Sequence, residues 1–338
     1  MLKKIFLSFL FLCLLAAAAA YFAWQQFQDY RAAAIVNVEQ VFKVPSGTHY
    51  GQLERMLTEA GMLQATPIYT PYFYKAVGKL RPELTRLKSG NFKLEAGWTL
   101  EQVLAHIVSG KEYQFKITFV EGSTYKQWQQ QIESTTGVTV TGGLDDEAAL
   151  AESLGLRQNK LEGFLQPQTY FFAYDIKDVD IVKRAFNAQK DYLKQAWAER
   201  DPELPLETPY EALILASIIE KETGHAPERD TISSVFVNRM RVGMRLQTDP
   251  TVIYGMGERY KGNITKKDLR EKTPYNTYTI DGLPPTPIAM PGVDAIHAAL
   301  HPADTKYFYF VSKGNGQHYF SKNLKEHNRA VRKYILKR

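Results

Sequence analysis

The feature that most constrains this chain is an uncharged apolar run near its N-terminus, IFLSFLFLCLLAAAAAYFAW, from Ile5 to Trp24. Twenty residues in an α-helix span about 30 Å, the thickness of the hydrocarbon core of a bilayer. Lys3 and Lys4 precede the run. By the positive-inside rule, residues 1–4 then stay in the cytoplasm and the rest of the chain lies outside. The sequence predicts a transmembrane helix at 5–24.

A cleaved signal peptide is the alternative interpretation, because the run from Ala16 to Ala20 contains A-x-A cleavage sites. A signal core is usually shorter, so a retained anchor is favoured. Cys13 is the only cysteine, and bulky Leu12 precedes it where a lipoprotein precursor has a small residue. The exported part therefore has no disulfide and no thiol nucleophile.

Composition adds a broad limit on the fold. The chain has 338 residues, of which 44% are hydrophobic and 23% are charged, which is typical of globular proteins. This length favours two folded units. The net charge of +6 is spread along the chain and accompanies no nucleic-acid-binding motif, so nucleic acid is not an expected partner.

Three glycines, Gly47, Gly97 and Gly122, each follow a short apolar stretch and precede a segment with helical periodicity. This pattern predicts a strand that ends in a glycine turn, with a hydroxyl group capping the next helix. We expect residues 44–118 to form a small βααβ module after a linker at 25–43. Such a turn is also common at helix entries in general, so the repeat has an ordinary alternative explanation.

Residues 119–338 predict a larger mixed α+β domain. Helical patterns cover 181–200, 210–223 and 229–243. After Leu246 the sequence becomes rich in Pro, Gly, Thr and Tyr, which indicates long ordered loops of the kind that carry function. The expected fold class is therefore α+β, with a transmembrane helix, a small module and a larger domain.

Glu220 and Glu222 end the apolar segment LILASIIEKETG. Positions i and i+2 of a helix point about 200° apart, so the two carboxyls cannot face one another as in an ordinary glycoside hydrolase. Glu220 shares its helix face with Leu213, Ala216 and Ser217. Apolar surroundings raise the pKa of a carboxyl group, which suits a general acid. The alternative is a helix end that simply emerges into solvent.

His297 and His301 have the spacing of two metal ligands on a helix, but no Glu follows the first and Pro302 ends the helix. His318 and His327 fit no ligand spacing. The chain has no G-x-S-x-G motif and no phosphate-binding glycine loop. We therefore expect no metal site, no cofactor and no serine nucleophile.

Three segments combine tyrosines with amide, hydroxyl and carboxylate side chains: RLQTDPTVIYG, TPYNTYTIDGLPPTPIAMPG and FYFVSKGNGQHYF. Tyrosine rings match the apolar faces of pyranose sugars, and polar side chains match their hydroxyl rims. The segments indicate a sugar-binding cleft. The alternative is a set of proline-braced loops whose tyrosines pack in the core.

Several motifs in one order resemble a known family. ASIIEKETG, FVNRMRVGMRLQTDPTVIYG, YNTYTIDGLPPTPIAMPG and YFYFVSKGNGQHYFSKNLKEHN are similar to the MltG or YceG-like endolytic murein (lytic) transglycosylases, as is LEGFLQPQTYFF. The resemblance covers essentially the whole chain. It implies a protein of the bacterial inner membrane with a single span, whose periplasmic part has a LysM-like module at 44–118 and a YceG-like catalytic domain at 119–338.

The resemblance also implies the reaction. Such enzymes cleave the bond between N-acetylmuramic acid and N-acetylglucosamine in peptidoglycan strands and leave a 1,6-anhydro-muramyl end, which terminates or trims nascent strands. The first glutamate of the E-K-E-T motif, Glu220, is then the catalytic acid, and Glu222 is structural and meets Arg239 or Arg241. The chain departs from the family at Gln168, where Asp is usual.

Other residues and partners follow from the same interpretation. The expected partners are glycan strands and the membrane, with penicillin-binding synthases as further candidates. A non-catalytic glycan-binding scaffold of the cell-wall machinery is the alternative function, and a hydrolase is a third. The substrate-binding residues are predicted to be Gln247, Thr248, Asp249, Tyr275, Asn276 and Tyr278.

Overall fold

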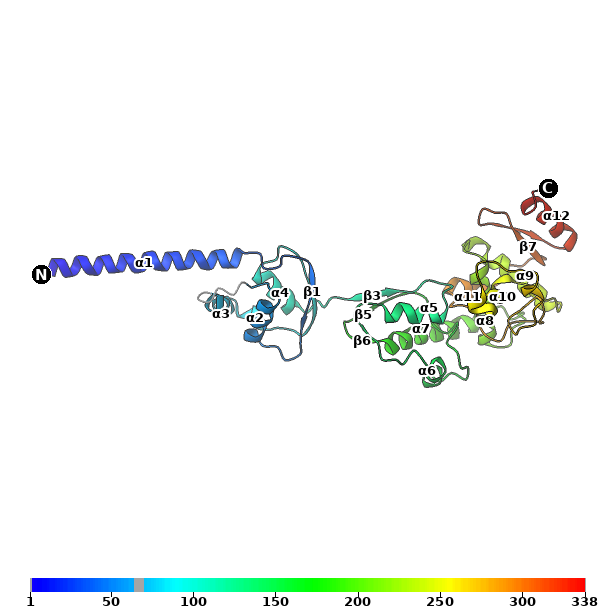
Figure 1. The fold of residues 1–338 in the computed structure, drawn as a ribbon, viewed down its shortest axis with the longest axis horizontal. Helices are drawn as coiled ribbons and strands as arrows, with labels where there is room; N and C mark the ends of the chain where they lie inside the picture. The colour runs from blue at the N-terminus through cyan, green and yellow to red at the C-terminus, as the bar shows by residue number, and fades with distance from the viewer. Residues whose placement is uncertain (1, 64–69, 338) are drawn as a thin grey trace. The chain divides into compact units, whose positions relative to one another are not determined.

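The structure is a computed structural model that describes residues 2–63 and 70–337. It divides into two compact units, Met1–Phe115 and Lys116–Arg338 (Figure 1). Helices and strands alternate through both units, which confirms the expected α+β class.

Helix α1, Leu2–Ala32, contains the predicted anchor. Within the described residues, its segment Ile5–Ala32 is the one helix long and apolar enough to cross a membrane. The segment 25–43, which was predicted to be a linker, contributes residues to the core of the first unit. Phe27, Ile35 and Val36 are buried in the core of the first unit, so this segment is part of that unit.

The first unit contains a two-stranded antiparallel sheet formed by β1, Gln40–Val44, and β2, Gly90–Leu94. The order β1, α2, α3, β2 agrees with the predicted βααβ order, and α4 follows. The helical faces predicted from apolar spacing are buried around Leu53, Leu57 and Val103. The helices are α2 (Tyr50–Glu59), α3 (Thr70–Leu80), the 3-10 turn η1 (Pro82–Thr85) and α4 (Leu100–Ser109).

The three predicted glycine turns are present, because Gly47, Gly97 and Gly122 have φ of 81°, 88° and 74°. A residue with a Cβ rarely adopts this left-handed region. Thr99 and Thr124 cap the following helices through capping boxes, as predicted. The first helix differs, since Nδ1 of His49 accepts from the backbone N–H of Gln52 at 3.1 Å in place of a hydroxyl.

The second unit has short strand pairs among its helices. Its strands are β3 (Phe115–Thr118) beside β5 (Thr169–Phe172), β4 (Val138–Thr139) parallel to β6 (Ile176–Lys177), and β7 (Tyr309–Ser312) antiparallel to β8 (His318–Ser321). Its helices are α5 (Tyr125–Glu133), α6 (Glu147–Ser153), α7 (Asp178–Ala198), α8 (Pro209–Glu222), α9 (Arg229–Arg241), α10 (Asp249–Met256), α11 (Val293–Leu300) and α12 (Leu324–Tyr334). Its 3-10 turns are η2 (Ala226–Glu228), η3 (Gly257–Arg259) and η4 (Asp268–Arg270).

Helix α8 forms the centre of the second unit's core and packs against α7, α9, α10 and α11 (Figure 1). It begins at Pro209 after a capping box between Thr208 and Glu211. Its residues from Ala212 to Ile219 are all buried, because the segment is apolar on every face. The helix ends at Glu222, since the next residue adopts extended backbone angles.

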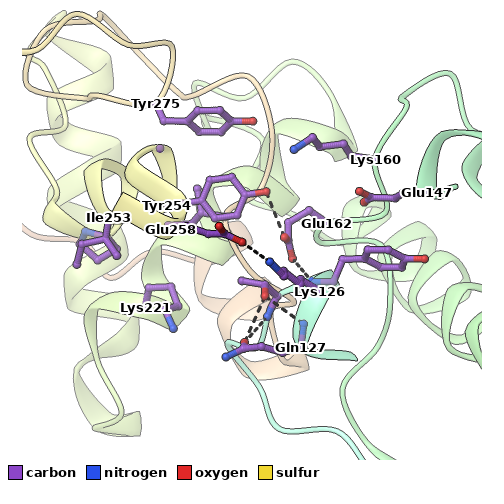
Figure 2. Close-up of a pocket in the computed structure, with 16 residues that line it drawn as sticks. Lys126, Gln127, Glu147, Lys160, Glu162, Lys221, Ile253, Tyr254, Glu258 and Tyr275 are labelled. Atoms are coloured by element: carbon purple, nitrogen blue, oxygen red, sulfur yellow. Dashed lines mark hydrogen bonds and ion pairs between the residues drawn. The ribbon is translucent and has the colours of Figure 1, made fainter. Parts of the chain in front are cut away.

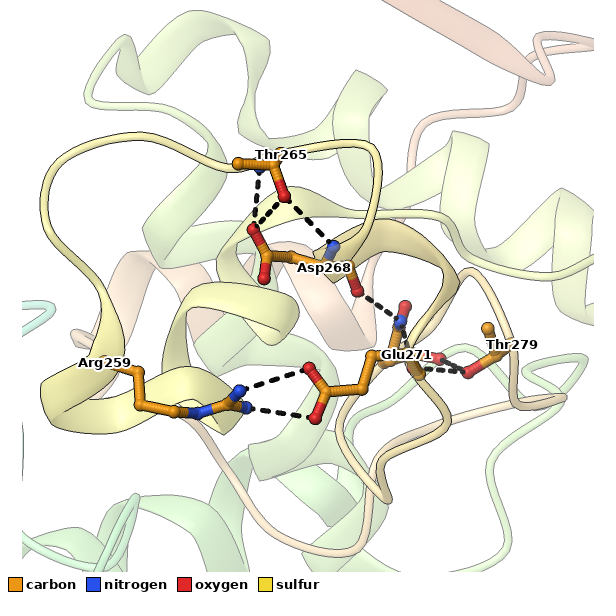
Figure 3. A network of polar contacts seen from close by, with 6 residues as sticks. Arg259, Thr265, Asp268, Glu271 and Thr279 are labelled. Atoms are coloured by element: carbon orange, nitrogen blue, oxygen red, sulfur yellow. Dashed lines mark hydrogen bonds and ion pairs between the residues drawn. The ribbon is translucent and has the colours of Figure 1, made fainter.

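The long loop between α10 and α11 is held by its own polar contacts (Figure 3). Arg259 forms a two-pronged ion pair with Glu271, with N–O distances of 3.2 and 3.3 Å. Asp268 accepts from the N–H and the hydroxyl of Thr265 at 2.8 and 2.6 Å. These contacts order the segment that carries two of the predicted substrate-binding tyrosines, as was expected of ordered loops.

Candidate active site

Glu222, at the C-terminal end of α8, lies in a pocket of about 350 Å³. The Thr248 hydroxyl donates a hydrogen bond to its Oε1. The loop before α10, strand β7 and helix α12 supply much of the remaining wall. The lining residues are Glu222, Arg239, Leu246, Gln247, Asp249, Tyr278, Tyr309, Phe310, Leu324 and His327.

The environment of Glu222 disfavours its charged form. Burial raises the pKa of Glu222 to about 7, the Thr248 hydrogen bond lowers it, the Asp249 charge raises it and the Arg239 charge lowers it. Protonated and ionised forms are therefore both available near neutral pH. A carboxyl group with such a pKa can donate a proton and take one back.

The sequence suggested a contact of Glu222 with Arg239 or Arg241. Arg239 lines the Glu222 pocket and acts on Glu222 through its charge. Its Nε donates to the carbonyl of Phe308 at 2.7 Å and its Nη1 to that of Leu246 at 2.7 Å. Arg241 instead donates to the carbonyl of Glu203. Arg239 thus joins the loop before α10 to the segment entering β7 and brings a positive charge to the pocket.

Four of the six predicted substrate-binding residues gather at the Glu222 pocket. Gln247, Asp249 and Tyr278 line it, and Thr248 contacts Glu222. The Tyr278 hydroxyl donates to Oδ1 of Asp249 at 2.6 Å. Gln247 has φ of +48°, an uncommon conformation for a residue with a side chain. Such strain is found preferentially at functional sites.

The other two predicted residues lie elsewhere. Tyr275 lines a second pocket, and its hydroxyl is 2.8 Å from Oγ1 of Thr286. Asn276 is buried, and its amide donates to the carbonyls of Asp268 and Glu271 at 3.1 and 2.6 Å. These bonds give Asn276 a role in holding the loop of Figure 3.

Glu220, the predicted acid, points to a different group of residues. Its Oε2 accepts from the backbone N–H of Gly292 at 3.0 Å, and its Oε1 is 3.5 Å from Nη2 of Arg229. Arg229 also pairs with Asp294 at 3.0 Å and with Glu121 at 3.7 Å. Burial raises the pKa of Glu220, as it does for Glu222. The pKa direction therefore does not separate the two glutamates, but their surroundings do.

A second pocket of about 670 Å³ contains a third buried glutamate, Glu162 (Figure 2). Its Oε1 accepts from the backbone N–H of Tyr125 at 3.1 Å, and its Oε2 accepts from the Tyr254 hydroxyl at 3.2 Å. Burial raises the pKa of Glu162 to about 8, while the two hydrogen bonds lower it. The carboxyl of Glu162 is therefore mostly neutral at pH 7.

The histidine rings behave as side chains in contact with one another. His297 and His301 have ring centroids 4.5 Å apart. Among the described residues, no group of three or more His, Cys, Asp and Glu side chains is placed to hold a metal ion.

The residues at these pockets that the predicted site lacked include the following four. Arg239, Tyr309 and His327 line the Glu222 pocket, and Glu162 lines the second one. All four lie in segments that carry the family resemblance. This resemblance is the signal in the sequence by which they could have been found. Their grouping depends on tertiary packing between distant segments of the chain, such as those of Glu222 and His327, which lie 105 positions apart.

Comparison with known proteins agrees with the motif order. The YceG-like family matches residues 42–333. A Bacillus subtilis (strain 168) protein named endolytic murein transglycosylase is 34% identical over 313 residues, which cover 86% of this chain and 84% of that protein. A Streptococcus pneumoniae serotype 2 protein of the same name is 26% identical, over 98% of this chain and 65% of that protein. A crystal structure of a yceG-like protein from Listeria monocytogenes has 29% identity and a TM-score of 0.52, and covers 87% of this chain and 99% of that one.

Proposed function

Because this chain belongs to the YceG-like family, we propose that it is an endolytic murein transglycosylase, the name that its relatives carry. The proposed substrate is the glycan strand of peptidoglycan. Cleavage falls between N-acetylmuramic acid and N-acetylglucosamine, leaves a 1,6-anhydro-muramyl end and terminates or trims nascent strands. The observation that carries the proposal is Glu222, a carboxyl of raised pKa in a pocket with four predicted substrate-binding residues.

In the proposed reaction one carboxyl group makes both proton transfers. Glu222 gives its proton to the glycosidic oxygen, and the bond from that oxygen to C1 of the muramyl sugar breaks. The resulting carboxylate takes the proton of the C6 hydroxyl of the same sugar while O6 forms a bond to C1. Atoms and charge balance without water, so no second acid is required.

Glu220 stands as the alternative acid, as predicted from the sequence. The pocket that contains Gln247, Asp249 and Tyr278 is lined by Glu222 rather than by Glu220. The contacts of Glu220 with Arg229 and the N–H of Gly292 suit a carboxylate that holds α8 to its neighbours. These surroundings support Glu222 as the acid, whereas the raised pKa of Glu220 and its place as the first glutamate of the E-K-E-T motif support Glu220, and the two variants below decide between them.

Hydrolysis is a second candidate reaction, and Asp249 is the observation that favours it. This carboxylate lines the same pocket as Glu222 and accepts a hydrogen bond from Tyr278. A second carboxylate beside a general acid is what a glycoside hydrolase uses to activate water. The products of the two reactions differ by one water molecule.

The proposed location is the bacterial cytoplasmic membrane. Helix α1 supports a single span, and Lys3 before the apolar run supports a cytoplasmic N-terminus with both folded units in the periplasm. The β1, α2, α3, β2 order supports a LysM-like module in the first unit. Glycan strands and the membrane are the proposed partners, with penicillin-binding synthases as further candidates.

The test uses the full chain in detergent micelles with purified glycan strands, and mass spectrometry of the products. Glu222→Gln and Glu220→Gln are matched variants, because each removes one ionisable group while keeping its size. We expect anhydro-muramyl ends from the parent, none from Glu222→Gln and a measurable amount from Glu220→Gln. The opposite order would assign the acid to Glu220. Products heavier by one water would establish a hydrolase, and binding without cleavage by the parent would favour the scaffold.

A further inference from the structure

The second pocket borders the same two helix ends as the Glu222 pocket. Asp249, the first residue of α10, lines the Glu222 pocket, whereas Pro250, Ile253 and Tyr254 line the second pocket. Consecutive residues of α8 divide in the same way, because Glu222 lines one pocket and Lys221 the other. A helix with its side chains is about 10 Å wide. Because neighbouring residues at the end of α8 and the start of α10 line both pockets, an extended ligand that passes over the start of α10 can reach both.

One wall of the second pocket suits a sugar ring. Tyr254 and Tyr275 have ring centroids 5.0 Å apart and a tilt of 58°, and both line the pocket (Figure 2). A Cβ on Gly255 would lie 2.9 Å from Cβ of Tyr275, so the glycine permits this close approach. Aromatic faces with apolar neighbours such as Ile253 match the apolar faces and the acetamido methyl groups of amino sugars.

Three lysines and three glutamates, Glu147, Glu162 and Glu258, line the same pocket. Lys126, Lys160 and Lys221 line it (Figure 2). Lys126 pairs with Glu258 at 2.6 Å, and both of these side chains are largely exposed. Exposed pairs are worth little, so an anionic ligand can replace Glu258 at small cost. Lys160 Nζ lies 6.0 Å from the centre of the Tyr254 ring.

The acidic groups of the pocket leave room for an anion. Glu162 has the raised pKa described above and accepts hydrogen bonds from the Tyr125 N–H and the Tyr254 hydroxyl. A neutral Glu162 does not repel a carboxylate. Glu147 accepts from the backbone N–H of Leu161 at 2.7 Å, and burial raises the pKa of its carboxyl.

We propose that the second pocket binds a peptide-bearing muramyl sugar of the strand, with its ring against Tyr254 and Tyr275 and a carboxylate of its peptide stem between Lys126 and Lys160. The inference rests on the proposed function, because the strand that is cut at Glu222 continues across α10 into this pocket. The enzyme therefore selects strands that carry peptide stems over strands from which the stems have been removed. Lys126 and Lys160 determine this specificity and take no part in bond cleavage.

The test compares peptide-bearing strands with the same strands after an amidase has removed their stems. We expect the full-length parent to have a kcat/KM about ten-fold higher for the peptide-bearing strands, mainly through KM, as one charge-assisted contact would give. The Lys126→Gln, Lys160→Gln double variant should lose this ratio. The Lys126→Arg, Lys160→Arg variant should keep it, because it keeps both charges. Lys183→Gln on the exposed side of α7 is the matched control and should leave the ratio unchanged.

A binding measurement separates this inference from the proposed reaction. Protein that carries both Glu220→Gln and Glu222→Gln is titrated with fluorescent strands of both kinds, so that neither candidate acid cuts them during the measurement. Suppose that peptide-bearing strands bind more tightly and that the Lys126→Gln, Lys160→Gln variant loses this preference. That result supports the proposed binding of peptide stems in the second pocket, even if the products prove to be those of a hydrolase. Equal binding of both strands, or a preference that survives in the Lys126→Gln, Lys160→Gln variant, would overturn the inference. Unaltered melting temperatures show that the variants are folded.

Discussion

The hydroxyl of Thr248 donates a hydrogen bond to Oε1 of Glu222 and thereby joins the start of α10 to the end of the buried helix α8. The bond favours the ionised form of Glu222, whereas burial and the neighbouring Asp249 favour the protonated form. These opposing influences leave the pKa of Glu222 at about 7.

Changes at Thr248 and Asp249 should therefore move the pH profile in opposite directions. In the proposed reaction Glu222 must be protonated to act as the general acid, so kcat should fall on the alkaline side with the pKa of Glu222. Thr248→Val removes the bond that lowers this pKa and should shift the alkaline limb upward by about one pH unit. Asp249→Asn removes the charge that raises it and should shift the limb downward. Asp281→Asn, an exposed change on the neighbouring loop, is the control for the pH–rate measurement. If the alkaline limbs of the two variants stay in place or move in the same direction, the group that controls kcat is not Glu222.

Glu162 should make stability depend on pH. Its folded-state pKa of about 8 exceeds the ordinary value of 4.5. Between these values the folded protein keeps a proton that the unfolded chain releases, so the free energy of unfolding falls as pH rises, by up to about 1.4 kcal/mol per pH unit. Glu162→Gln removes this contribution, and its melting temperature should decline less between pH 5 and pH 8. Glu152→Gln, at an exposed site on α6, is the control. Parallel curves for parent and Glu162→Gln would contradict the expectation.

Arg239 should be essential to the stability of the Glu222 pocket. Its guanidinium satisfies the carbonyls of Phe308 and Leu246. Arg239→Ala leaves both without their donor and should lower the free energy of unfolding by roughly 2–4 kcal/mol, as read by chemical denaturation. Arg241→Ala removes one exposed contact, with the carbonyl of Glu203, and should cost less than about 1 kcal/mol. Equal losses from the two variants would argue against this role.

Two glycines provide a matched test of close packing beside Glu162. Gly163 has φ of +83°, and a Cβ there would lie 2.5 Å from Cγ of Pro287. Gly155 has φ of +80° and no atom within 4 Å of such a Cβ. Gly155→Ala should cost about 1–2 kcal/mol from backbone strain alone, and Gly163→Ala should cost about 1–3 kcal/mol more from the clash. Thermal unfolding compares the two, and similar losses would show that Pro287 yields without cost.

Local sequence patterns predicted the secondary-structure elements better than they predicted the residues of the candidate active site. Apolar periodicity gave α4, α7, α8 and α9, because one face or all faces of each helix are buried. The short helix α10 was missed, since its segment reads as a loop rich in Pro, Thr and Tyr. Helix geometry also indicated that Glu220 and Glu222 diverge. That Glu222 lines a pocket with Gln247 and Tyr278 depends on the loop before α10, on β7 and on α12, and these contacts leave no local pattern in the sequence.

The burial of Phe27 has a mechanical consequence. The residue lies on α1, seven positions after the Ala20 that ends the alanine run, and packs in the core of the first unit, while Arg31 on the same helix pairs with Glu101 at 2.5 Å. Where α1 crosses the bilayer, it holds that unit as a rigid extension of the span and not through a flexible linker. Each residue inserted after Trp24 would raise the unit by about 1.5 Å and turn it by about 100° about the helix axis. If α1 is a membrane anchor as proposed, its length therefore sets both the height of the first unit above the lipid surface and its rotation about the helix axis.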